Sequence, residues 1–186
     1  MGYGGRELAS AFRTVRKNTI QIAEDIPESK YDYVAAPEVR SVAAMLAHIA
    51  ISTRGRIELS KLKLKTFVGF DFPGFIAPFL AEEAKPRTKA ELLALLRTEG
   101  EAFAAWLESQ TPESLAEMIT EPDGKTEKSR FERILGAKEH EMHHRGQLML
   151  IERQLGIVPH LTRQFNERMA QMRATQAQAA PSTAAR

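Results

Sequence analysis

The stretch SRFERILGAKEHEMHHRGQLMLIERQLG, residues 129–156, decides the fold class of this chain. It opens with Ser129 and Glu132 at the spacing of a capping box, in which the two side chains satisfy each other's free backbone amides. Gly156 follows the last apolar position and Pro159 lies just beyond it, as is typical of a helix end. Apolar residues recur between these limits every three or four positions, so the stretch predicts one long amphipathic helix.

Three more segments show helical periodicity. The first is ended by Pro27, and the second runs from about Glu38 to Glu58. The third begins at a capping box formed by Thr88 and Glu91. Their apolar stripes consist of Leu8, Phe12, Val15, Thr19, Ile22 and Ile26, of Val42, Met45, Leu46 and Ile49, and of Leu92, Leu96, Gly100, Phe103 and Leu107. No segment has a convincing strand pattern, so we predict an all-α protein built on a four-helix bundle.

The connections complete the predicted organisation. Residues 66–86 are rich in Phe, Pro and Gly, and we expect a loop that plugs one end of the bundle rather than the wall of a ligand pocket. Residues 111–128 predict a polar connection with a short helical turn and a turn at Pro122-Asp123-Gly124. The bundle should occupy residues 1–160.

The C-terminal part of the chain predicts a further helix. Residues 161–175 place apolar side chains at helical spacing, and we expect an amphipathic helix that packs on the bundle or on a partner subunit. Residues 176–186 contain mainly Ala, Gln, Ser and Thr, which predicts a mobile tail or an extension of that helix.

Composition excludes several classes of protein. The 26 basic and 24 acidic residues give a net charge of +2, which offers no electrostatic reason to expect nucleic acid. The absence of cysteine excludes disulfides, thiolate metal sites and a cysteine nucleophile. No apolar run reaches the roughly 18 residues of a membrane span, and no apolar signal core follows the first methionine. We therefore expect a cytoplasmic protein that does not associate with membranes.

Two histidines share the inward face of the 129–156 helix. His140 and His144 lie about 40° apart around the helix axis, in the seam that contains Ala137 and Leu148, whereas His143 lies about 100° away from His144. Histidines four residues apart on a helix can chelate one metal ion, because successive turns direct both rings to one point. We favour a metal over a pair of hydrogen-bonded core histidines, because two buried imidazoles need partners for their ring nitrogens.

A metal site of this kind needs a third protein ligand. His48 is the strongest candidate, because it lies in the middle of the second helix at the edge of its apolar stripe. In a bundle, that residue can reach the level of His140 and His144. His160 follows the end of the fourth helix, where a surface or loop position is expected.

A second interpretation of the same stretch is a zinc protease. Residues 140–144 match the pattern H-E-x-x-H, in which two histidines bind zinc and Glu141 would act as the base. The extended pattern with a later Gly and His is absent, although Glu167 could supply a third ligand. The apparent lack of a sheet argues against this class of enzyme, and Glu141 and His143 both fall outside the inward seam.

Motifs in both halves of the chain resemble the DinB family. The first half contains Tyr31-Asp32-Tyr33, Pro37-Glu38-Val39-Arg40-Ser41-Val42 and Met45-Leu46-Ala47-His48. The second half contains His140-Glu141-Met142-His143-His144-Arg145-Gly146-Gln147-Leu148, then Arg153-Gln154-Leu155-Gly156 and Val158-Pro159. The resemblance covers roughly residues 6–160, and the chain continues for some 27 residues beyond the segment where family members often end.

The resemblance implies an up-down-down-up four-helix bundle, often a homodimer, with a divalent metal such as zinc, nickel or iron held by three histidines. By position in the motifs these are His48, His140 and His144. The family includes low-molecular-weight-thiol S-transferases and a related maleylpyruvate isomerase. The resemblance therefore implies a metal-dependent enzyme, thiol S-transferase-like or hydrolase-like, that acts on a small molecule, with transfer to or isomerisation with a low-molecular-weight thiol as the expected reaction. The alternative is a dimeric, stress-related binding protein with a structural metal. Arg145 could steer an anion or fix its helix, and Gln147 could support a ligand or pack between helices.

Overall fold

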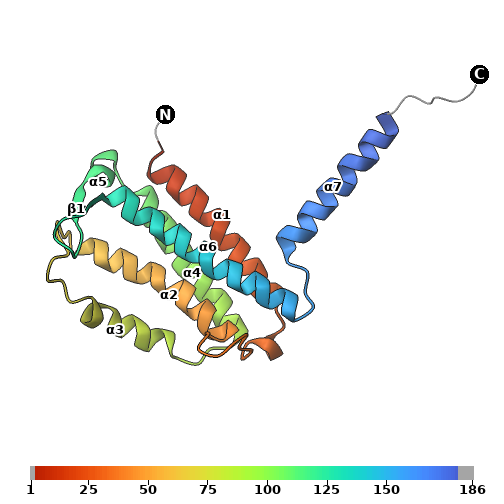
Figure 1. The fold of residues 1–186 in the computed structure, drawn as a ribbon, viewed down its shortest axis with the longest axis horizontal. Helices are drawn as coiled ribbons and strands as arrows, with labels where there is room; N and C mark the ends of the chain where they lie inside the picture. Colours follow the sequence, from red (N-terminus) through yellow and green to blue (C-terminus); the bar gives the residue numbers. More distant parts are fainter. Residues whose placement is uncertain (1–2, 180–186) are drawn as a thin grey trace, which may run out of the picture.

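Four long helices form the body of the protein, and the computed structural model describes residues 3–179 (Figure 1). Their bounds are Gly5–Asp25 for α1, Val42–Lys61 for α2, Lys89–Glu108 for α4 and Arg130–Gln154 for α6. Both predicted capping boxes are present, at Thr88–Glu91 and at Ser129–Glu132. The all-α four-helix bundle with an additional C-terminal helix is therefore confirmed.

Ion pairs and hydrogen bonds between helices establish the up-down-down-up topology. Arg97 bonds Glu24 and Arg13 bonds Glu108, so α4 runs antiparallel to α1. The pair Arg16–Glu141 and the edge contact between the rings of Tyr3 and Phe131 show that α6 runs parallel to α1. Contacts of His48 with His140 and of Arg56 with Gly136 show that α2 and α6 are antiparallel.

The buried side chains of the bundle form two apolar clusters, one toward each end. The predicted stripes are buried as expected, with Phe12 and Phe103 in one cluster and Ile22, Ile49 and Leu148 in the other. Between the clusters lies a layer of polar side chains, made of His48, His140, His144, Arg16 and Glu141. We call these five residues the polar layer.

The second helix begins later than predicted, and the segment before α4 is not a loop. Glu38 has a left-handed backbone conformation with φ of 61°, so the helix cannot start there and begins after the capping side chain of Ser41. Within residues 66–86, helix α3 spans Phe72–Glu83 and is capped by Asp71. It lies along α2 rather than over an end of the bundle, with the ring of Phe79 against Gly55 (Figure 1).

The connection between α4 and α6 contains a small hairpin that the sequence did not reveal. The expected helical turn is present as α5, Pro112–Ala116, and the turn at Pro122-Asp123-Gly124 joins β1, Met118–Thr120, to β2, Glu127–Ser129. Each strand has three residues, too few to show an alternating pattern. The loop after α2 joins the hairpin, because the amide of Phe67 donates to the carbonyl of Thr120.

Helix α7, His160–Ala179, leaves the bundle after its first turn and projects away from it (Figure 1). A bond from Arg163 to Asp25, 2.6 Å long, holds its start against α1. Phe165 and Met172 are 61% and 50% exposed, so packing on a partner subunit stays a prediction. Residues 176–179 of the expected tail are helical, and residues 180–186 lie outside the described part. No helix within residues 3–179 is long and apolar enough to cross a membrane.

Candidate metal centre

The structure brings the three predicted histidines together. His48 comes from α2, and His140 and His144 lie one turn apart on α6. One nitrogen of each ring lies within 4.8 Å of those of the other two. Nε2 of His140 is 3.0 Å from Nε2 of His48 and 3.2 Å from Nε2 of His144. The three Nε2 atoms therefore converge on one point.

Two neighbouring side chains fix the orientation of the rings. Nδ1 of His48 lies 3.0 Å from both carboxylate oxygens of Glu83, at the end of α3, and donates its hydrogen to that carboxylate. Nδ1 of His144 lies 2.8 Å from Oε1 of Gln147 and donates to it. Because a neutral imidazole carries one hydrogen, Nε2 of His48 and of His144 are then left with lone pairs.

The histidines cannot satisfy one another by hydrogen bonding. His140 can donate from Nε2 to His48 or to His144, but not to both, so at least one inward lone pair lacks a donor. A divalent cation at the point of convergence would satisfy all three. Three imidazole nitrogens are a common ligand set for zinc that leaves a position open for another molecule. The donor set therefore fits the metal site that the sequence predicts.

The surroundings keep the rings in the neutral form that binds metals. Burial, with the charges of Arg40 and His144, lowers the pKa of His48 to about 4. Burial and the neighbouring histidines lower the pKa of His140 to about 3. Burial also lowers the pKa of His144, against the opposing effect of Gln147. Protons therefore do not compete for the lone pairs near neutral pH.

Glu141 differs from the sequence-based expectations in both its role and its position. Its side chain is buried, with 1% exposure, and Oε1 and Oε2 accept from Nε and Nη2 of Arg16 at 2.9 and 3.0 Å. Thr19 donates a third bond of 2.8 Å. A carboxylate fully engaged by a buried guanidinium is not the base of a zinc protease, so that interpretation is wrong. The expectation that Glu141 falls outside the inward seam is also wrong, because its buried side chain joins α6 to α1.

Arg16 extends this connection to the other two helices of the bundle. Its guanidinium also donates to the carbonyl oxygens of Leu96 on α4, at 2.7 Å, and of Ile49 on α2, at 3.3 Å. Gly100 makes this possible, since a Cβ there would lie 2.7 Å from Cγ of Arg16. The side chain of Arg16 thus bonds to all three neighbouring helices. Its bond to α2 is with Ile49, the residue that follows His48.

Sequence reasoning missed Glu83 and Arg16, because both act across long distances in the chain. Glu83 is 35 residues from His48, and Arg16 is 125 residues from Glu141. Gln147 had been proposed as a support for a ligand, and its bond to His144 agrees. A glutamate at the end of an unrecognised helix gives no local signal of its role.

The other polar residues considered in the sequence lie outside the centre. His143 is exposed, and its ring contacts that of His144 from outside. Glu167 is exposed on α7, where it is no ligand of the cluster. His160 is buried at 3% exposure and its Nε2 lies 3.2 Å from Oδ1 of Asn18, so the expected surface position is wrong. It is the first residue of α7, and Asn18 lies on α1.

Comparison with known proteins agrees with the family resemblance found in the sequence. Residues 11–148 match the DinB superfamily. An uncharacterised protein of Bacillus subtilis, YjoA, is 28% identical over 151 residues, which cover 81% of this chain and 90% of YjoA. The crystal structure of YjoA, a DinB-like protein, superposes with a TM-score of 0.59 at 27% identity, over 81% of this chain and 92% of YjoA.

Two further solved structures share the fold. YfiT from Bacillus subtilis, described as a probable metal-dependent hydrolase with an unusual four-helix bundle topology, has a TM-score of 0.63 at 18% identity, over 82% of this chain and 88% of YfiT. A DinB-like protein from Bacillus cereus has a TM-score of 0.63 at 16% identity, over 82% and 93% of the two chains. The chain belongs to the DinB superfamily.

Proposed function

We propose that this member of the DinB superfamily is a metal-dependent enzyme that acts on a small molecule, with a divalent ion held by His48, His140 and His144. The observation that carries the proposal is the convergence of three Nε2 atoms that cannot all be hydrogen-bonded to one another. Burial of unpaired polar atoms is unfavourable, so an arrangement of this kind is typical of a site whose partner is a ligand.

The reaction we propose is attack by an activated nucleophile. A divalent ion bound by three neutral histidines would lower the pKa of a water molecule or a thiol at its open position. Glu83 and Gln147 would hold the rings of His48 and His144 in the ligating orientation. Hydrolysis is the first candidate, supported by the likeness of the fold to YfiT.

Transfer to a low-molecular-weight thiol is the second candidate. The chain has no cysteine, so any thiol would come from a cosubstrate such as glutathione, bacillithiol or mycothiol. Arg40 favours this candidate, because its exposed guanidinium lies close enough to affect the pKa of both His48 and His144. A positive charge at that position would attract the carboxylate groups of glutathione or bacillithiol.

An activity screen of metal-loaded protein tests the proposal. Zinc-, nickel- and iron-loaded samples would be assayed against small esters and amides, each with and without the three thiols. We expect turnover that is lost with a chelator and in His144→Ala, and that survives in His143→Ala as the matched control. Turnover that persists in His144→Ala would contradict the proposal.

The alternative of a structural metal makes a different prediction for stability. A structural ion would add its binding free energy to folding, so a chelator would lower the melting temperature sharply. We propose a catalytic ion, because two apolar clusters and the Arg16–Glu141 pair already hold the four helices together. The melting curve of the chelated protein should therefore stay cooperative.

A further inference from the structure

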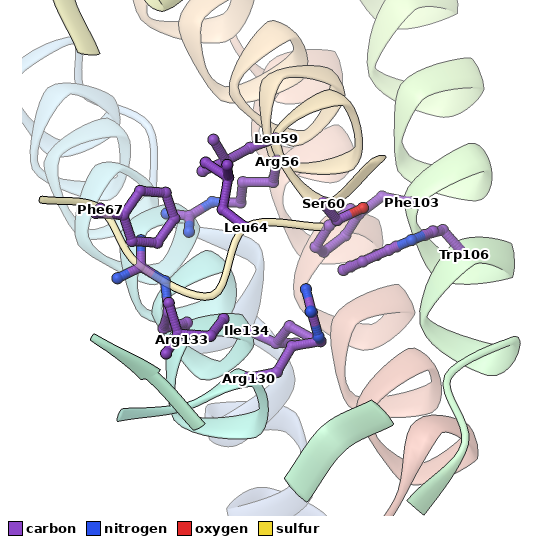
Figure 2. A pocket seen from close by; sticks show the side chains of 11 residues that line it. Arg56, Leu59, Ser60, Leu64, Phe67, Phe103, Trp106, Arg130, Arg133 and Ile134 are labelled. Atoms are coloured by element: carbon purple, nitrogen blue, oxygen red, sulfur yellow. The ribbon is translucent and has the colours of Figure 1, made fainter. Parts of the chain in front are cut away.

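A cavity lies between α2, α4 and α6, at the end of the bundle next to the hairpin (Figure 2). It opens to solvent and has a cavity volume of about 70 Å³. Arg56, which lines it, follows His48 on α2 by eight residues, about 12 Å along the helix axis. The cavity is therefore distinct from the candidate metal centre.

The lining of the cavity combines positive charge with aromatic rings. Its 11 lining residues include three arginines and no acidic residue. Phe103 and Trp106 form one wall as a stacked pair, with ring centroids 5.3 Å apart. On the opposite side the guanidinium of Arg133 lies 4.0 Å from the centroid of Phe67 (Figure 2). Such a lining favours a ligand that is both anionic and apolar.

Two of the three arginines are paired with carboxylates of the hairpin region. Arg130 bonds Glu117 at 2.5 Å, and Arg133 bonds Glu121. These pairs leave a donor free, because Nε of Arg130 is buried and has no hydrogen-bond partner among the described residues. The two ion pairs hold the hairpin against α6, and Glu117 also pairs with the exposed Lys65 at 3.2 Å.

Arg56 is the arginine whose charge is not balanced. Within residues 3–179 it has no salt bridge to a carboxylate, and its guanidinium donates a hydrogen bond to the carbonyl of Gly136 at 3.2 Å. Burial and the charge of Arg133 lower its pKa. The cavity thus carries one uncompensated positive charge beside an apolar wall.

We propose that this cavity binds a small monoanionic carboxylate that carries an apolar, preferably aromatic, group. The carboxylate would pair with Arg56 and accept from Nε of Arg130, and the apolar group would pack on Phe103 and Trp106. Arginine suits this task, because its planar guanidinium bonds carboxylates in a fixed geometry. The site requires no metal and goes beyond the function proposed for the histidines.

The chain supplies its own reporter for this site. Trp106 is the only tryptophan of the sequence, so intrinsic fluorescence reports on the wall of the cavity. The probe is phenylacetate, titrated into the full chain after treatment with a chelator. Two matched probes separate the contributions of the charge and of the aromatic ring to binding. The first, 2-phenylethanol, has the ring without the charge, and acetate has the charge without the ring.

We expect a saturable change in fluorescence with phenylacetate, and binding at least about tenfold weaker for each matched probe. Arg56→Met should weaken phenylacetate binding by at least about tenfold, and Arg56→Lys, which keeps the charge, should bind more tightly than Arg56→Met. Lys61→Met is the control, because it removes an exposed charge from the same helix. Circular dichroism melts would verify that each variant folds.

Several results would overturn this proposal. They are the absence of a saturable change, equal binding of 2-phenylethanol and phenylacetate, and wild-type affinity in folded Arg56→Met. A parallel titration of zinc-loaded protein in which phenylacetate binds, while the chelated protein does not bind it, would place the anion at the histidines and overturn the proposal as well. Because the titration is done without metal, its failure is distinguishable from a failure of the metal-dependent function.

Discussion

His140 and Glu141 are adjacent on α6, yet they belong to two groups of the polar layer that differ in how their atoms are paired. On one side, Glu141 accepts three hydrogen bonds and its partner Arg16 donates to two further carbonyl groups. On the other side, Nε2 of His140 faces the lone pairs on Nε2 of His48 and of His144, and it can donate a hydrogen bond to only one of them. Both groups are largely buried, so burial alone does not distinguish them.

The difference indicates what each group does. A buried network whose donors and acceptors are paired fixes the helices relative to one another, and it has no capacity for a ligand. A buried group with convergent unpaired atoms has that capacity. Substitutions in the first group should therefore affect stability, whereas substitutions in the second should affect metal binding and leave the fold intact.

The largest effect is expected for Glu141→Ala. It leaves the guanidinium of Arg16 buried without its carboxylate, and the loss of one partner of a buried ion pair costs about 3–5 kcal/mol. Denaturant unfolding would measure this change. The control is Glu101→Ala, which breaks the exposed pair with Arg13 and should cost less than about 1 kcal/mol. If both substitutions lowered the free energy of unfolding equally, the Arg16–Glu141 pair would contribute no more to stability than an exposed ion pair.

A smaller effect, on affinity rather than stability, is expected for Glu83→Gln. The carboxylate orients His48 through Nδ1, and loss of such a partner typically weakens metal binding by about 10- to 100-fold. Calorimetric titration with zinc would measure it. Glu82→Gln is the matched control, because Glu82 precedes Glu83 on α3 and pairs with Arg87 instead. Unchanged affinity in Glu83→Gln would mean that α3 does not contribute to the centre.

The smallest effect concerns Glu152, which lies on α6 beyond both groups. Its side chain is fully buried, and neither carboxylate oxygen has a hydrogen-bond partner among the described residues. Burial and the charge of Asp25 raise its pKa to about 7. Because the pKa is higher in the folded protein, stability is greatest below the unfolded value and is lost as pH rises through about 7.

Glu152→Gln should therefore stabilise the protein at pH 8 by about 1 kcal/mol and have little effect at pH 4.5. Thermal melts at the two pH values would measure the difference. Asp25, Arg163 and Arg153 are the charged neighbours that affect this titration. A variant less stable than the wild type at pH 8 would show that the carboxylate has a partner that offsets its burial.

The helices and the three histidines could be predicted because their signals are local. The capping boxes at Thr88 and Ser129 fix two helix starts, and the spacing of His140 and His144 places both rings on one face. Helix α3 was missed because Pro78 lies inside it and its composition is typical of a loop. The hydrogen bonds of Arg16 to Glu141 and of Glu83 to His48 were missed, because no local pattern connects these residues across the chain.

The metal content of the wild type and of His48→Ala, purified without a histidine tag and loaded with zinc, tests the central claim most directly. His48 is the ligand contributed by α2, so its loss leaves only the two histidines of α6. We expect about one ion per chain in the wild type and a several-fold lower content in the variant, with unchanged circular dichroism. Equal metal content in the two proteins, or none in the loaded wild type, would contradict the three-histidine centre.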